Sequence, residues 1–432
     1  MFSNVKPISV TSLVLLVALS RSAPIFTECA SVALSRLPSN GVSYQTALNR
    51  DGRYIAFLSS GTDLVFFDTN GFQDIFVRDL LTGTTKSVSV STSGALADRA
   101  SLYPAISGDG RYVAFASDAT NLVDGDTNSA TDVFVRDTVA NTTSKVSTGE
   151  AGAQTFGFST LPAISSNGRY VAFQSISSNI ITGVSGIQIY VRDLQTGTTA
   201  LASASSAGVK GNDASGNPSI SADGRYVAFD SYSTNLVSGD TNGYIDVFVR
   251  DMVTGVTVRA SRTSLGNQAN YRSYNPSISD DAKTVVFTSE ATDMVPMDFN
   301  NSPDAFAHDL LTSSTTCISV NSAGTPAGNG SAAPSVSSNG RYVAFESNSG
   351  DIPGGTDGLW KIFLRDRLTN TTQLISIAMA GATPNLESYD PWISGDGRYV
   401  GWESGASNFV SGDGNNATDV FVRGPRRPLI WP

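Results

Sequence analysis

Aspartate and asparagine recur at fixed spacing in short loops along this chain. Five loops share the pattern Asp-x-Asn-x-x-x-Asp, which brings two carboxylates and one amide oxygen into seven residues. A hard cation such as calcium needs several convergent oxygen ligands, and alternate positions of a tight turn supply them. The loops are therefore predicted to bind calcium. The candidate ligands are Asp68, Asn70 and Asp74; Asp126, Asn128 and Asp132; Asp240, Asn242 and Asp246; Asp298, Asn300 and Asp304; and Asp413, Asn415 and Asp419.

The loop at 124–132 carries the most complete set, because Asp124 adds a further acid. Gly71 and Gly243 stand where such a loop must bend sharply. Most copies lack the first acid and the closing bidentate Glu of an EF-hand, so we expect weak binding, roughly millimolar, as in extracellular calcium modules. The alternative is that Asp and Asn only cap these turns through Asx hydrogen bonds.

A second set of acids follows apolar runs: Asp230, Glu346 and Glu403 each stand in a Phe-x-Ser or Trp-x-Ser context. Paired carboxylates can carry out glycoside hydrolysis, and aromatic residues such as Tyr389 and Trp392 lie nearby in the sequence. A carbohydrate-active hydrolase or lyase is therefore one hypothesis. The other is that these acids are solvated strand ends.

The chain contains one histidine, His308, at a position that other repeats mostly fill with Arg. We interpret it as a variant of the repeat, which excludes His-dependent triads and disfavours a His-ligated metal site. The sequence also lacks a Gly-x-Ser-x-Gly elbow in a strand–helix context and a nucleotide-binding motif. Binding is therefore favoured over catalysis.

The elements that must position these residues come from an internal repeat. A short turn, Asp-Gly-Arg in most copies, recurs every 56 to 58 residues, beginning at positions 51, 109, 167, 223, 281, 339 and 396. Between apolar β-prone runs it predicts a hairpin. A further run such as Val133–Asp137 and a Ser/Val-rich strand such as Ser87–Ser91 complete the unit. Each repeat therefore holds four short strands, a to d.

Four-stranded units repeated around a ring predict an all-β, seven-bladed β-propeller. The last repeat ends at Val420–Arg423 without strand d, whereas Cys29–Val32 stands 22 residues before the first turn, where a strand d belongs. Residues 25–35 are therefore predicted to complete the last blade. Cys29 and Cys317 then lie on outer strands of separate blades as unpaired packing residues. The b–c and d–a loops share one face, so the acidic loops should line one rim.

The run Pro104–Phe115, with Asp132–Asp137 after it, resembles the WD40-like repeat of TolB-type propellers. The acidic loops resemble the short calcium loops of integrin-type propellers. The resemblance implies a propeller over nearly all of the mature chain, although the extra N-terminal domain and six-bladed ring of TolB itself do not fit this sequence. Such propellers serve as interaction platforms, as parts of peptidases and as polysaccharide lyases, so the fold alone does not choose a function.

The net charge and the targeting signals limit which partners and which cellular location we expect. A net charge of −10 argues against a nucleic-acid partner. Lys6 and the apolar run Val10–Ser20 predict a signal peptide over 1–20, with a retained membrane anchor as the alternative. The propeller should span 25–424, with a tail at 425–432 and no membrane span in the mature chain.

We therefore expect an exported protein, periplasmic or extracellular, monomeric and not an enzyme. It should bind a protein or a glycan on the face of the acidic loops, with calcium stabilising those loops. The alternative function is a carbohydrate-active hydrolase or lyase that uses carboxylates in the central funnel.

Overall fold

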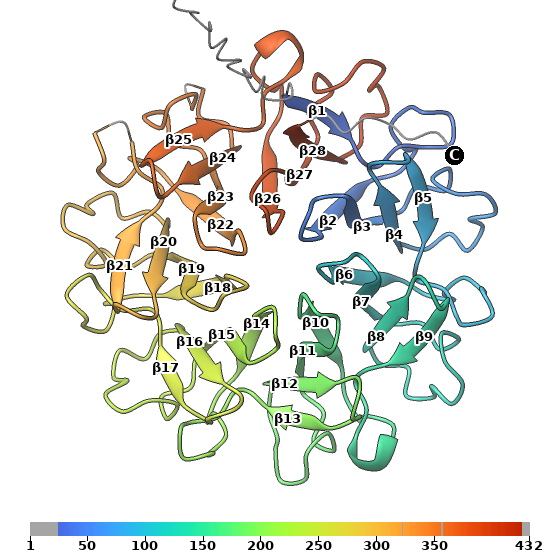
Figure 1. The fold of residues 1–432 in the computed structure, drawn as a ribbon, viewed down its shortest axis with the longest axis horizontal. Coiled ribbons are helices and arrows are strands. Elements are labelled where there is room, and N and C mark those ends of the chain that lie inside the picture. Colours follow the sequence, from blue (N-terminus) through green and yellow to red (C-terminus); the bar gives the residue numbers. More distant parts are fainter. Residues whose placement is uncertain (1–24, 322, 356, 426–432) are drawn as a thin grey trace, which may run out of the picture.

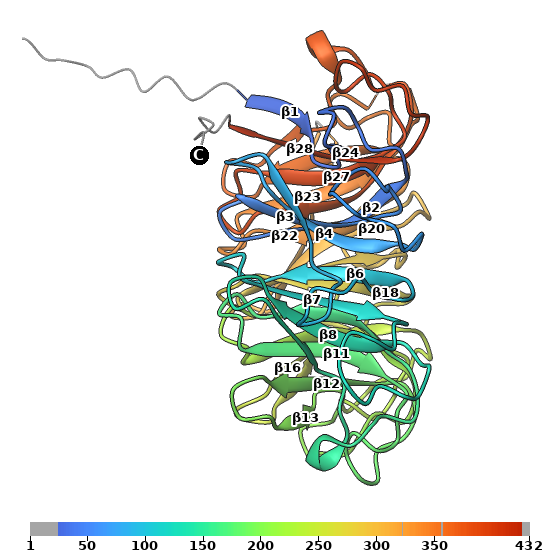
Figure 2. The same ribbon diagram turned by 90° about the vertical axis from the view of Figure 1, so that its right-hand side faces the viewer.

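Seven four-stranded antiparallel sheets are arranged around a central axis (Figure 1). The computed structural model describes residues 25–321, 323–355 and 357–425. Seen from the side, the sheets form a single disc-like layer with loops on both faces (Figure 2). The predicted seven-bladed propeller is confirmed, and the predicted signal peptide lies outside the described residues.

Each blade runs from inner strand a to outer strand d. Blade 1 contains β2 (Ser43–Leu48), β3 (Tyr54–Ser59), β4 (Asp74–Asp79) and β5 (Thr84–Ser87). Blade 2 contains β6 (Ser101–Ile106), β7 (Tyr112–Ser117), β8 (Asp132–Asp137) and β9 (Thr142–Lys145). Blade 3 contains β10 (Ser159–Ile164), β11 (Tyr170–Ser175), β12 (Gln188–Asp193) and β13 (Thr199–Leu201). Blade 4 contains β14 (Ser215–Ile220), β15 (Tyr226–Ser231), β16 (Asp246–Asp251) and β17 (Thr257–Arg259). Blade 5 contains β18 (Ser273–Ile278), β19 (Thr284–Ser289), β20 (Asp304–Asp309) and β21 (Ser314–Cys317). Blade 6 contains β22 (Ser331–Val336), β23 (Tyr342–Ser347), β24 (Lys361–Asp366) and β25 (Thr371–Leu374). Blade 7 contains β26 (Ser388–Ile393), β27 (Val400–Ser404), β28 (Asp419–Pro425) and β1 (Ile25–Cys29). Two short 3₁₀ helices, η1 (Glu150–Gly152) and η2 (Met379–Gly381), lie in d–a loops.

The ring closes as predicted. Strand β1 pairs antiparallel with β28, with Ile25 opposite Pro425 and Cys29 opposite Phe421. Beyond the strand, the Ser31 Oγ donates to an Asp419 carboxylate oxygen at 2.6 Å. The first and last described segments of the chain therefore lie in one sheet.

The outer strands begin earlier than predicted. In blade 1 the strand covers Thr84–Ser87 rather than Ser87–Ser91, and the closing strand β1 ends at Cys29. The reason is that the following Ser/Val segment crosses the start of strand c. There Ser89 Oγ accepts from the Ile75 N–H at 3.0 Å and donates to Asp74 at 2.5 Å. Cys29 and Cys317 are both free thiols on outer strands, as expected.

The Arg of the Asp-Gly-Arg or Asn-Gly-Arg turn pairs with the last Asp of strand c in blades 1, 2, 3, 4 and 6. In blade 4 the Arg225 guanidinium makes two hydrogen bonds to Asp251, at 3.0 and 2.7 Å, and lies over the Tyr226 ring at 4.9 Å. Gly224 adopts φ +78°, and a Cβ there would lie 2.1 Å from the Tyr170 ring of the preceding blade. The motif therefore fixes the hairpin against strand c and the neighbouring blade.

His308 occupies the Arg position of strand c, as predicted, and is buried with 3% exposure. Its Nδ1 lies 2.9 Å from Thr315 Oγ1, where Arg136 of blade 2 donates to the equivalent Thr143 at 3.1 Å. Burial first, and then the charge of Arg262, lower the pKa of His308 from 6.5 to about 4.

His308 should make the fold sensitive to mild acid. Because the pKa of His308 is lower in the folded state, the unfolded chain binds a proton there at a higher pH than the folded chain does. The contribution of His308 to the free energy of unfolding is therefore fully present above pH 6.5 and decreases as the pH falls toward 4. We expect this residue to remove up to about 3 kcal/mol of unfolding free energy over that interval. The measurement is urea denaturation of the wild type and of His308→Gln between pH 7 and 4, since carboxylates titrate alike in both. Parallel pH profiles would contradict the prediction.

Candidate functional site

The acidic loops lie between strands b and c and contact the d–a loops, so both sets line one face. In all five loops the Asn residue holds the turn: its Oδ1 accepts the N–H two residues on, and its Nδ2 donates to a carbonyl of the d–a loop. In blade 1 these bonds join Asn70 to Phe72 at 3.1 Å and to Ala97 at 3.0 Å. The same arrangement recurs at Asn128, Asn242, Asn300 and Asn415. The five asparagines therefore form the Asx turns of the alternative hypothesis.

The two aspartates of each loop turn inward. In blade 1 Asp74 is buried at the start of strand c, where it accepts from Ser89 at 2.5 Å and Asn70 at 2.7 Å. Asp68 is 8% exposed, and its Oδ1 has no hydrogen-bond partner among the described residues. Burial raises the pKa of Asp68, and it raises the pKa of Asp74 to about 6.

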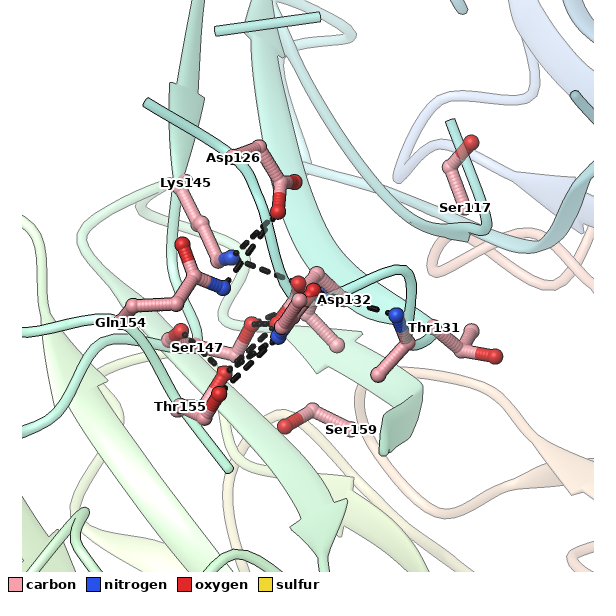
Figure 3. A network of polar contacts seen from close by, with 12 residues as sticks. Ser117, Asp126, Thr131, Asp132, Lys145, Ser147, Gln154, Thr155 and Ser159 are labelled. Atoms are coloured by element: carbon pink, nitrogen blue, oxygen red, sulfur yellow. Dashed lines mark hydrogen bonds and ion pairs between the residues drawn. The ribbon is translucent and has the colours of Figure 1, made fainter. Parts of the chain in front are cut away.

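Two blades supply their own cation between the acids. In blade 2, Lys145 Nζ lies 2.5 Å from Asp132 and 3.3 Å from Asp126, as Figure 3 shows. In blade 4, the Arg259 guanidinium lies 3.6 Å from Asp246 and 3.7 Å from Asp240. The additional acid of blade 2, Asp124, is exposed.

The remaining blades divide in two. Blades 5 and 7 keep the buried closing acids Asp304 and Asp419, and burial raises the pKa of Asp304 to about 8 and that of Asp419 to about 6. In blades 3 and 6 the closing position is Gln188 and Lys361 instead. Within residues 25–321, 323–355 and 357–425, no three His, Cys, Asp or Glu side chains form a metal-holding group. A cation in these loops would therefore need hydroxyl, backbone or water oxygens as well as the two carboxylates.

A central channel of about 450 Å³ is lined by strand a of all seven blades. In each strand a the pairing with strand b shifts after the second residue, and the third residue has positive φ, between 47° and 54°. These bulge residues are Gln45, Tyr103, Leu161, Asn217, Asn275, Ala333 and Asp390. A bulge releases its N–H from the ladder, so this donor needs another partner.

The predicted catalytic acids are among those partners. Asp230 accepts the Asn275 N–H at 3.0 Å, Glu346 accepts the Asp390 N–H at 2.8 Å, and Glu403 accepts the Gln45 N–H at 2.9 Å. In two other blades an uncharged side chain is the acceptor: Gln45 accepts the Tyr103 N–H and Thr288 accepts the Ala333 N–H. The three acids lie inside strand b, at its penultimate residue, where each faces the bulge of the next blade. The alternative that they are solvated strand ends therefore does not describe them.

Glu346 and Glu403 also form a group of charges with Asp390, which lines the channel. Burial is the main reason why the pKa of each rises to about 7, and the charge of Asp390 adds to both. Asp230 is not among the charges that act on them. Asp390 was not among the predicted site residues, although six of the seven bulge residues, Asp390 included, stand directly before a proline, which within a strand is a signal of a bulge. Trp392, 42% exposed, also lines the channel.

The a–b end of the channel is held by a continuous ring of backbone hydrogen bonds between successive blades. The bonds run from Arg50 N to Gly108 O, Gly108 N to Ser166 O, Asn167 N to Ala222 O, Ala222 N to Asp280 O, Asp281 N to Ser338 O, Ser338 N to Gly395 O and Asp396 N to Arg50 O. Arg50 and Asp280, from blades 1 and 5, approach to 3.9 Å. Because these blades are not neighbours, the two side chains reach across the opening.

The opposite end lies on the face of the acidic loops, where several b–c and d–a loops carry exposed apolar side chains, among them Phe67 and Met297 at one shared loop position. Phe67 is 88% exposed and Met297 is 60% exposed, and both have positive φ, 64° and 66°. The other five blades have glycine with positive φ at this position: Gly125, Gly183, Gly239, Gly354 and Gly412. Bulky residues rarely adopt this conformation and tend to do so at functional sites.

In the described part of the chain, no helix is long and apolar enough to cross a membrane. No protein-family model matches the chain, and no curated protein matches it in sequence.

Several solved structures share its architecture. An oligogalacturonate lyase in complex with manganese aligns over 95% of this chain and 98% of its own, with 12% identity and a TM-score of 0.55. The β-propeller domain of the Trilobed protease from Pyrococcus furiosus aligns over 88% and 95%, with 9% identity and a TM-score of 0.54. TolB from Acinetobacter baumannii aligns over 78% of this chain and 65% of its own, less than two thirds, with 14% identity and a TM-score of 0.41. At these identities the likeness extends to the propeller fold alone.

Proposed function

We propose that this chain is an exported, non-enzymatic propeller that binds a protein or a glycan on the face of the acidic loops, at the mouth of the central channel. The observation that carries the proposal is the difference between the two ends of the channel, since c–d turns of the opposite face also expose apolar residues such as Leu311. Arg50 and Asp280 span the channel at the a–b end, whereas exposed Phe67 and Met297 stand at the loop face. A ligand therefore has room and apolar contact area at the loop face.

The environment of the acids supports binding rather than catalysis. Asp230, Glu346 and Glu403 each accept a backbone N–H from the next blade, and uncharged side chains fill the same role elsewhere in the ring. A carboxylate engaged in this way holds two blades together. It is therefore less available to act as a nucleophile or a general acid.

The proposal includes calcium as a stabiliser of the rim. The acid pairs Asp68/Asp74, Asp298/Asp304 and Asp413/Asp419 are the ones that would hold it, because none of these acids forms an ion pair with a Lys or Arg among the described residues. Bound calcium would neutralise their charges and tie the b–c loop to the start of strand c.

A screen of immobilised glycans and peptides, with and without calcium, would identify the ligand. Phe67→Gly should weaken binding at least tenfold without lowering the melting temperature, because glycine fits this φ in five other blades. Leu311→Ser, on an exposed c–d turn of the opposite face, is the control and should bind like the wild type. Equal losses in both variants, or none in Phe67→Gly, would contradict the placement of the site.

The alternative, a carbohydrate-active hydrolase or lyase, is favoured by one observation. Burial raises the pKa of both Glu346 and Glu403 to about 7, as expected of acids tuned for proton transfer. The lyase that shares this fold suggests oligogalacturonate as the first substrate to test. Turnover by the wild type that is lost in Glu346→Gln, with the melting temperature unchanged, would establish the enzyme and reject the scaffold.

A further inference from the structure

At one position of strand d, the residue type varies between blades together with the residues of the acidic loop in the same blade. The position is the residue of strand d that pairs with the third residue of strand c. In order from blade 1 to blade 7 this residue is Ser87, Lys145, Leu201, Arg259, Cys317, Leu374 and Cys29.

The seven residues fall into three classes. Where the position is basic, as at Lys145 and Arg259, its charged group lies beside both acids of its loop. Where it is Leu201 or Leu374, the closing acid is absent and Gln188 or Lys361 takes its place. Where it is Ser or Cys, both acids are kept, and none of the described Lys or Arg side chains pairs with them.

We infer that this strand-d residue decides whether a blade binds a divalent cation, and that blade 1 holds such a site between Asp68, Asp74 and Ser87. The inference rests on the calcium part of the proposed function and is independent of the ligand on the loop face. In blades 2 and 4 a side-chain cation then takes the place that a metal ion occupies in blade 1.

Unpartnered buried atoms support the site in blade 1. Asp68 is 92% buried, being 8% exposed, and its Oδ1 has no hydrogen-bond partner in the described chain. The buried Oγ of Ser87 also lacks one. Buried oxygens of this kind are rarely left unpaired, and a bound ion would satisfy both.

The geometry of blade 2 shows where the ion belongs. The ammonium of Lys145 lies 2.5 and 3.3 Å from the two carboxylates that correspond to Asp74 and Asp68. Serine is several bonds shorter than lysine, so Ser87 leaves that place free, and its hydroxyl would reach an ion there through a bridging water. Because all three groups bind through oxygen, the site suits a hard cation such as calcium rather than zinc or copper.

The test exchanges the residues of the two blades. Ser87→Lys should place an ammonium between Asp68 and Asp74, and Lys145→Ser should open the equivalent site in blade 2. By isothermal titration of the chelator-treated full chain with calcium, we expect Ser87→Lys to bind one calcium fewer than the wild type and Lys145→Ser to bind one more. Ser87→Lys should also melt higher than the wild type in chelator.

Asp68→Asn serves as the second variant, because it keeps the shape of the loop and removes a ligand charge without adding an ammonium. It should also lose one calcium, but it should gain less stability in chelator than Ser87→Lys. The inference is overturned if Ser87→Lys or Asp68→Asn binds as many calcium ions as the wild type with unchanged affinity, or if the wild type binds none. Ligand binding on the loop face is measured separately, so a failure there leaves this result intact.

Discussion

Removal of residues 25–35 is expected to have the largest effect of any change considered, because it takes β1 out of blade 7. Five residue pairs between β1 and β28 are lost, together with the contact of Ser31 with Asp419. Strand β28 then becomes an open edge, which favours aggregation. A chain that begins at residue 36 should melt roughly 10 °C or more below one that begins at residue 25, or be insoluble.

The control for this truncation is a synthetic peptide with the sequence of residues 25–35. Added in excess, it should raise the melting temperature of the shortened chain, because a ligand that binds only the folded state stabilises that state. A peptide in which Cys29 and Ser31 are exchanged for charged residues should not. Equal melting temperatures for the two chain lengths would refute the role of β1 in closure.

Trp402→Ala is expected to cost about 3–5 kcal/mol of unfolding free energy, the usual range for emptying a large aromatic site in a core. Trp402 is fully buried, with 0% exposure, and packs against Phe421 at 6.0 Å and Phe409 at 5.4 Å between ring centroids. The six other blades place Phe at this position of strand b. The measurement is urea denaturation monitored by circular dichroism.

Trp402→Phe is the matched variant. It should cost only about 1 kcal/mol, because it restores the residue of the other blades and removes a buried indole N–H that has no hydrogen-bond partner among the described residues. A small effect of the Ala variant, comparable to that of Phe, would mean that the core of blade 7 is loosely packed.

The fold was predictable because each repeat carries its own local signals. The Asp-Gly-Arg turn and the 56 to 58-residue spacing define the hairpins and the number of blades. The position of Cys29–Val32 before the first turn revealed the closure, although strand d itself begins earlier. That shift could not be foreseen, because the bonds of Ser89 to Ile75 and Asp74 depend on tertiary contacts.

The site was less predictable for two reasons. Lys145 follows Asp132 by 13 residues, and Arg259 follows Asp246 by the same number, so a comparison of strand d with the acidic loop of its own repeat would have found both resident cations. By contrast, the role of Glu346 as acceptor for the Asp390 N–H depends on a bulge and on the neighbouring blade. The proline after the bulge residue indicates the bulge within one repeat, but nothing in that repeat indicates which side chain of the neighbouring blade accepts the N–H.

The pairing of β1 with β28 has a consequence for biogenesis. The Val420 N–H that donates to Ser31 Oγ is separated from it by 389 residues, so β1 leaves the ribosome long before its partner β28. Contacts this distant in sequence form late and slowly. Blades 1 to 6 can each pair from neighbouring residues, whereas a chain that stops before residue 419 has no partner for β1. Closure of the ring therefore cannot precede the synthesis of β28, and until then β1 has no edge to pair with.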